Sequence, residues 1–199
     1  MKKMKSRLIL ALALTSTHVF AQVGQQHVGA QDTVGLDAQQ EKHALRVLLK
    51  IAEKLVGSAA NAMPADKYGF APTDGEFKGV RSFGQMVKHL SATNYILAAA
   101  ALGEEPPADA GDEQGPEAAR TKAEIINYLK GSFVQLDNAI EAVGQTNLPV
   151  KSSPISPLKS AEATRMALVE ESLMHAADHY GQMVEYLRMN GIVPPASRP

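Results

Sequence analysis

Apolar residues recur at steps of three and four in four separate stretches of the chain, and this spacing limits the fold more than any other feature. It places each set of apolar side chains on one face of a helix. The helices are expected at roughly 37–60, 83–102, 121–144 and 161–190. In the first stretch the apolar set is Leu45, Leu48, Ala52, Leu55 and Ala59. Four such faces bury one another best in a bundle, and no stretch alternates as a strand does, so we predict an all-α four-helix bundle.

The ends of these stretches carry residues that are typical of helix starts and helix ends. Ser82 with Gln85, and Thr121 with Glu124, have the spacing of capping boxes, which satisfy free N–H groups in the first turn of a helix. Asn190-Gly191, followed by two prolines, is typical of a helix C-terminus. The connections between the stretches are long for a bundle, which is typical of a crossover or a functional loop.

The N-terminus has the layout of a secretory signal peptide. A basic MKKMKSR precedes the apolar LILALAL and the small residues of VFA, so we predict a signal peptide at 1–21, cleaved after Ala21. The apolar run is far shorter than the ~20 residues that a membrane span needs. We therefore expect an exported, periplasmic protein with no membrane span in the mature chain; an uncleaved N-terminal anchor is the alternative. Residues 22–36 are expected to form a flexible leader, and 37–196 the bundle domain.

The composition excludes two kinds of chemistry. The whole chain has 20 basic and 21 acidic residues, and the predicted signal peptide contains only basic ones, so the mature chain is acidic and has no electrostatic footprint for nucleic acid. There are no cysteines, so no thiolate can act as nucleophile or metal ligand. A bound metal must be held by His, Asp, Glu or neutral oxygens.

His175 and His179 project from the same helix face on successive turns, which lets two imidazoles reach one ion. On a helical wheel they form a column with Gln182 and Tyr186, between the apolar stripe and the charged face. This position is where a cleft between helices would be lined. Surface histidines are the alternative, because the spacing alone is a weak indication of a metal site.

His89 has a similar position in the second helix, next to Leu90 of the apolar stripe. If the two helices are neighbours, three imidazoles converge and leave one coordination position open, which is a catalytic geometry. The alternative is a core histidine that hydrogen-bonds a backbone carbonyl. The sequence contains no His-Glu-x-x-His, Glu-x-x-His or Gly-x-Ser-x-Gly motif.

Two segments together resemble the DinB/YfiT-like family: MPADKYGFAPTDGEFKGVRSFGQMVKHLSATNYILAAAALGE at 63–104, and HAADHYGQMVEYLRMNGIVPP near the C-terminus. The resemblance covers about residues 37–196. It implies an up-down-down-up bundle with a long connection between the second and third helices. It also implies a divalent transition metal, often nickel or zinc, held by His89, His175 and His179. Homodimers are common among such relatives, and those of known activity include thiol-dependent transferases and an isomerase.

These observations lead to two functional hypotheses. The first is an exported metal-dependent hydrolase or transferase that acts on an unknown small molecule, with no catalytic residue identified. The second is a non-catalytic exported metal-binding or scaffold protein. For either hypothesis the family resemblance makes a homodimer a candidate assembly. Four polar residues are candidates for holding the ligands or lining a pocket, with ordinary solvent exposure as the alternative: Asn94, Asp178, Gln182 and Tyr186.

Overall fold

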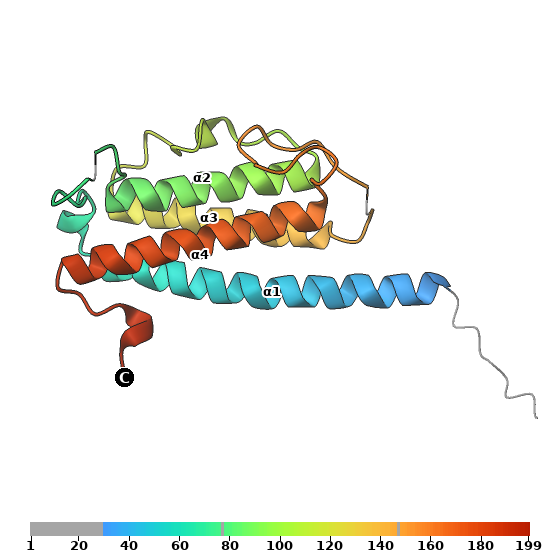
Figure 1. The fold of residues 1–199 in the computed structure, drawn as a ribbon, viewed down its shortest axis with the longest axis horizontal. Helices are drawn as coiled ribbons and strands as arrows, with labels where there is room; N and C mark the ends of the chain where they lie inside the picture. The colour runs from blue at the N-terminus through green and yellow to red at the C-terminus, as the bar shows by residue number, and fades with distance from the viewer. Residues whose placement is uncertain (1–29, 77, 147) are drawn as a thin grey trace, which may run out of the picture.

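A computed structural model describes residues 30–76, 78–146 and 148–199 (Figure 1). The four helices are α1 (Ala30–Ala62), α2 (Phe83–Leu102), α3 (Lys122–Glu141) and α4 (Arg165–Met189). The described residues also form three short 3₁₀ helices, which lie between α1 and α2, between α2 and α3, and after α4: η1 (Ala65–Lys67), η2 (Ala108–Ala110) and η3 (Pro195–Ser197). The described residues contain no strand, so the predicted all-α class is confirmed.

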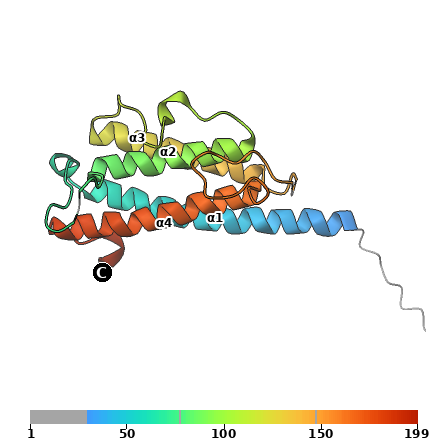
Figure 2. The same cartoon turned by 45° about the horizontal axis from the view of Figure 1, so that its top comes forward.

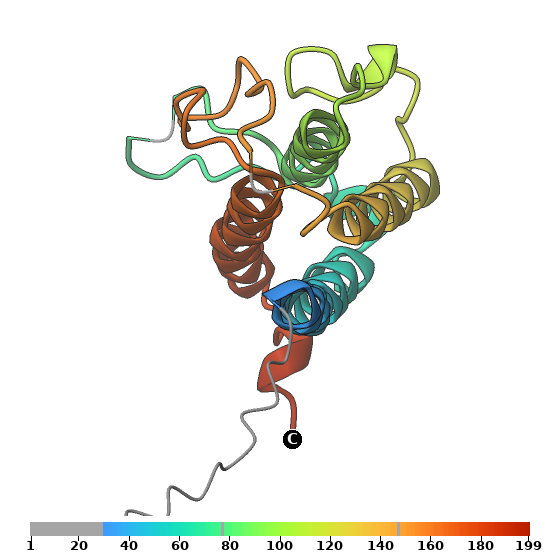
Figure 3. The same ribbon diagram turned by 90° about the vertical axis from the view of Figure 1, so that its right-hand side faces the viewer.

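The helices form a bundle in which α1 and α4 run in one direction and α2 and α3 in the other (Figures 1 and 2). Viewed along the bundle, α2 lies between α3 and α4, and α1 closes the opposite corner (Figure 3). Because α2 and α3 are parallel, residues 103–121 must return along the whole bundle; we call this segment the strap. The up-down-down-up order predicted from the sequence is therefore confirmed.

The buried face of α1 differs in part from the one that its apolar spacing predicts. Leu45 and Ala59 are buried as expected, but Leu48 is 51% exposed. Leu49 and Val56 take part in the core instead. The helix carries apolar residues on more than one face, so spacing alone does not identify the face that packs, and Leu48 is left beside a groove between α1 and α4.

The helix ends follow local capping chemistry. Both predicted capping boxes form, at Ser82 for α2 and at Thr121 for α3. Helix α4 begins four residues later than position 161, because the Thr164 side chain accepts from the Ala167 N–H and caps it there. Helix α1 begins at Ala30, inside the predicted leader 22–36. Gly35 does not end it, since one glycine costs a helix only about 1 kcal/mol.

The start of α2 is anchored to the end of α1, which sets the height of His89 in the bundle. The Gly84 N–H donates to the Tyr68 carbonyl at 2.8 Å, and the Tyr68 hydroxyl donates to the Ala60 carbonyl at 2.7 Å. Tyr68 is buried, and its burial raises the pKa of the phenol.

The predicted signal peptide at 1–21 lies outside the described residues. Within them, every helix is too short or too polar to span a membrane.

Candidate metal centre

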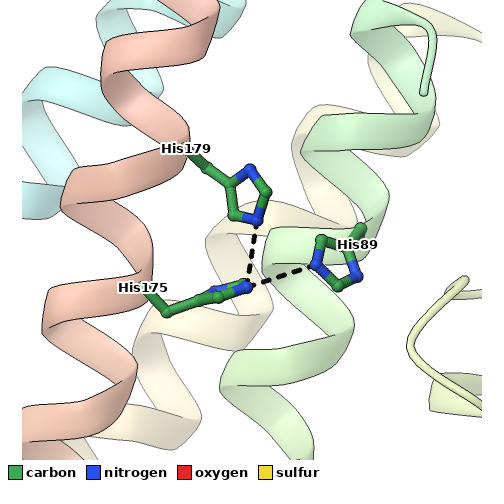
Figure 4. A group of neighbouring side chains, drawn as sticks. All are labelled: His89, His175 and His179. Atoms are coloured by element: carbon green, nitrogen blue, oxygen red, sulfur yellow. Dashed lines mark hydrogen bonds between the residues drawn. The ribbon is translucent and has the colours of Figure 1, made fainter. Parts of the chain in front are cut away.

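Three imidazoles meet between α2 and α4 (Figure 4). The Nε2 atom of His175 lies 3.2 Å from Nε2 of His89 and 3.0 Å from Nε2 of His179. One nitrogen from each of the three residues falls within 4.8 Å of the other two. We call His89, His175 and His179 the histidine centre. The structure thus brings together the three residues that the sequence analysis proposed as ligands.

The spacing of these nitrogens suits a shared metal ion. Nitrogens ~2.0–2.1 Å from one ion are ~3.3 Å apart in a tetrahedral site and ~3.0 Å apart at neighbouring octahedral positions. The two separations between Nε2 atoms, 3.2 and 3.0 Å, are of this size. Within the described residues, no Asp or Glu or further His joins the group. The donor set is therefore three neutral nitrogens, which imidazole-preferring ions such as zinc and nickel accept.

The strap fixes the orientation of the His89 ring. Its Nδ1 lies 2.9 Å from the Glu113 carbonyl oxygen and donates to it when this nitrogen carries the proton. That tautomer leaves the Nε2 lone pair free to face the other two histidines, as a metal ligand requires. The alternative reading of His89, a core histidine bonded to a carbonyl, is thus true of one ring nitrogen, while the other belongs to the centre.

Burial keeps the centre uncharged. It lowers the pKa of His175 to about 3 and that of His179 to about 4, and the neighbouring imidazoles and Arg81 add to the effect. The pKa of His89 is lowered as well, mainly by burial. A proton and a metal ion compete for the same lone pair, so lowered pKa values favour metal binding near neutral pH. Two buried atoms, Nδ1 of His175 and Nδ1 of His179, have no hydrogen-bond partner in the described part of the chain.

A cavity of about 460 Å³ opens beside His175. Glu113 of the strap lies on its wall, so the strap borders the site, as does the connection that carries Ile155 and leads into α4. Both segments lie on the side of α2 away from α1 (Figure 3). The remaining wall comes from α2 and α4: Thr93, Glu171, Met174, His175 and Asp178.

Of the four polar residues expected near the ligands, two lie at the edge of the site. Asp178 lines the cavity and accepts a hydrogen bond from Gln182 at 2.9 Å. Both side chains are exposed, and Gln182 donates to this carboxylate. The two side chains also act on His179, since each raises the pKa of that imidazole against the larger effect of burial. Asp178 therefore has the position of a pocket residue, and Gln182 supports it.

The other two residues have structural contacts. Asn94 is fully buried, where it accepts from the Ser172 hydroxyl at 2.7 Å and donates to Ser132 at 3.2 Å. It thereby joins α2, α3 and α4 through the core. Tyr186 is buried as well, and its hydroxyl donates to the Arg81 carbonyl at 3.1 Å. None of these three hydrogen bonds involves the histidine centre.

Three residues beside the site were missed by the sequence analysis. Thr93 lies four positions after His89, and Glu171 four positions before His175, so helical spacing could have found both. Glu113 is different, because it reaches His89 only through the path of the strap. Its backbone has φ 73°, an unusual value for a residue with a side chain.

The comparison with known families gives one match. The family model of the DinB superfamily matches residues 48–183, which include all three histidines and the strap. No curated protein matches the chain.

Proposed function

The chain belongs to the DinB superfamily, and we propose that it is a metal-dependent hydrolase or transferase acting on a small molecule. The observation that carries the proposal is the convergence of three Nε2 atoms at the edge of a cavity large enough for a substrate. Three protein ligands leave a coordination position for water or substrate, as catalytic rather than structural sites do. Zinc and nickel are the ions that we propose.

The bound ion would act as a Lewis acid and lower the pKa of a coordinated water. The protein's own part is to hold His89, His175 and His179 neutral and in place, through burial and through the Glu113 carbonyl. Asp178 lies on the cavity wall, where a carboxylate can accept a proton from a bound molecule.

Elemental analysis and metal titration test the first part of this proposal. We expect about one equivalent of zinc or nickel per chain, lost on dialysis against a chelator and regained on titration. His89→Ala, His175→Ala and His179→Ala should each weaken binding about 10-fold or more, because each removes one ligand. His43→Ala is the matched control, since His43 is an exposed histidine of α1. Less than about a tenth of an equivalent, with no uptake on titration, contradicts the proposal.

An open coordination position separates the enzyme from a non-catalytic metal-binding protein. Cobalt(II) in place of the native ion gives a visible spectrum that reports its ligands. If His89, His175 and His179 are the only protein ligands, added azide should change this spectrum. An unchanged spectrum with cobalt bound would indicate a fourth protein ligand, and hence a structural or scaffold role.

We propose that the protein is exported, supported by the signal-peptide layout of residues 1–21. Mass spectrometry of the protein from its native host should then give a mature chain that begins at Gln22. Recovery of the chain with residues 1–21 still attached would contradict this proposal.

We also propose a homodimer formed through α1 and α4. Three exposed apolar side chains support it, because they gather around one groove: Leu48 is 51% exposed, Ile51 50% and Met174 69%. Light scattering should give twice the chain mass, and Ile51→Glu should give a monomer. Val134→Glu, at an exposed apolar position of α3, should leave the dimer intact. A monomer in the unsubstituted protein at micromolar concentration refutes the dimer.

A further inference from the structure

The cavity beside His175 is acidic. Glu113, Glu171 and Asp178 lie on its wall, and its described lining includes no lysine or arginine. Neither Glu171 nor Asp178 forms an ion pair with a basic side chain of the described residues. Carboxylates around a low-dielectric cavity concentrate cations there. We call this space the acidic cavity.

Thr93 gives a second and independent indication that the acidic cavity holds a ligand. This residue lies on the cavity wall and is only 5% exposed. Its Oγ1 is buried and has no hydrogen-bond partner among the described residues. Leaving a buried hydroxyl unpaired has a cost in stability. A bound molecule with a donor or acceptor at this end of the cavity would remove that cost.

The arrangement of the carboxylates suits an organic cation better than a second metal ion. Within the described residues, only the histidine centre brings three potential ligand atoms within reach of one ion. The carboxylates are therefore spread along the wall. Ser156 donates to Glu171 at 2.6 Å and holds that carboxylate in place. Three apolar side chains line the same cavity, those of Ile155, Pro157 and Met174.

We infer that the acidic cavity binds small organic ammonium compounds, so that the substrate carries an amine. Glu171, Asp178 and Glu113 attract the ammonium group, and the apolar wall contacts its hydrocarbon part. The inference rests on the proposed function for the role of His175, which places the other end of the molecule beside the metal. Binding of the ammonium group itself requires only the carboxylates.

Three six-carbon probes test which charge on a small molecule the acidic cavity prefers. Hexylammonium, 1-hexanol and hexanoate are titrated into isotope-labelled protein at neutral pH, and the methyl signals of Thr93, Ile155 and Met174 are followed by NMR. Metal-free and zinc-loaded protein are both used, and hexanoate is compared in the metal-free protein, where its carboxylate has no open metal position to occupy. We expect hexylammonium to bind at least about fivefold more tightly than 1-hexanol, and hexanoate to bind most weakly. Equal affinities, or a preference for hexanoate, overturn the inference.

Substitution of the carboxylates tests whether they bind the ammonium group. Glu171→Gln and Asp178→Asn should each weaken hexylammonium about threefold, and the double variant about tenfold, with 1-hexanol unaffected. Glu117→Gln is the matched control, since it removes one charge at an exposed position of the strap, outside the cavity lining. Unchanged affinity in the double variant overturns the inference. Ammonium binding without metal uptake would contradict the proposed function and leave this inference standing. Metal uptake without ammonium binding would contradict this inference and leave the proposed function standing.

Discussion

Asn94→Ala should destabilise the bundle strongly and leave the histidine centre intact. Asn94 is fully buried, and its side chain joins three helices through hydrogen bonds to Ser172 and Ser132. The Ser132 hydroxyl donates in turn to the Leu129 carbonyl at 2.8 Å. Truncation therefore removes two hydrogen bonds and leaves the Ser172 hydroxyl in the core without its acceptor.

The cost follows from these contacts. Two hydrogen bonds contribute about 1 kcal/mol each, and an unpaired buried hydroxyl adds about 1–3 kcal/mol. The Ser172 donor can turn to a carbonyl of its own helix and recover part of this. We expect a loss of about 3 kcal/mol in the free energy of unfolding. For a chain of this size, each kcal/mol lowers Tm by about 2–4 °C, so Tm should fall by about 6–12 °C.

Urea denaturation of the metal-free protein measures this loss, and zinc titration measures the second part of the prediction. Zinc affinity should change less than about twofold, because neither hydrogen bond of Asn94 involves a histidine. Asn127→Ala, at an exposed position of α3, is the matched control and should change stability by less than about 0.5 kcal/mol. A loss below about 1 kcal/mol, or zinc binding weakened about tenfold, would refute the structural role assigned to Asn94.

Three further predictions concern the pH, the metal and one glycine. The pKa values of His175 and His179 are about 3 and 4 in the folded chain, so the unfolded chain binds more protons below its own histidine pKa of about 6.5. Stability of the metal-free protein should therefore fall by about 2 kcal/mol per histidine between pH 7 and 5; urea denaturation at both pH values checks this, and His175→Gln should show a smaller fall. Zinc at about 100 times its Kd should raise the free energy of unfolding by about 2.7 kcal/mol, and calorimetry should show no such gain in His179→Ala. Gly84→Ala should lower the free energy of unfolding, measured by urea denaturation, by about 1–2 kcal/mol. The added Cβ would lie 3.1 Å from a ring carbon of Tyr68 and 3.2 Å from the Tyr68 carbonyl oxygen. Gly57→Ala is the control, because its Cβ would enter open space, and it should be neutral or stabilising.

Short-range patterns account for what the sequence predicted correctly. The capping boxes at Ser82 and Thr121 involve residues three positions apart, so their geometry depends only on the local helix. The column of His175 and His179 follows from helical spacing in the same way. The third histidine of the centre required a longer step, from the position of His89 beside a buried face to the packing of α2 against α4.

Contacts that depend on the path of a loop could not be predicted. Nothing in the sequence around Glu113 indicates that its carbonyl meets a histidine 24 positions earlier. The exposed Leu48 shows the corresponding limit for α1, where apolar residues occur on several faces and only the packed neighbours decide which are buried. The acidic cavity could not be predicted for the first of these reasons. Residues of α2 and α4 form part of its wall, but the rest comes from the strap and from the connection that carries Ile155.

The hydrogen bond between His89 and the strap would couple metal binding at the histidine centre to the order of the strap. The Glu113 carbonyl selects the tautomer of His89 that has a free Nε2 lone pair. A metal bound to that lone pair would stabilise the contact between the strap and His89 by the same free energy that this contact adds to metal binding. The rate at which amide hydrogens of the strap exchange with solvent would thus report metal occupancy at the histidine centre, although the strap itself offers no ligand to it.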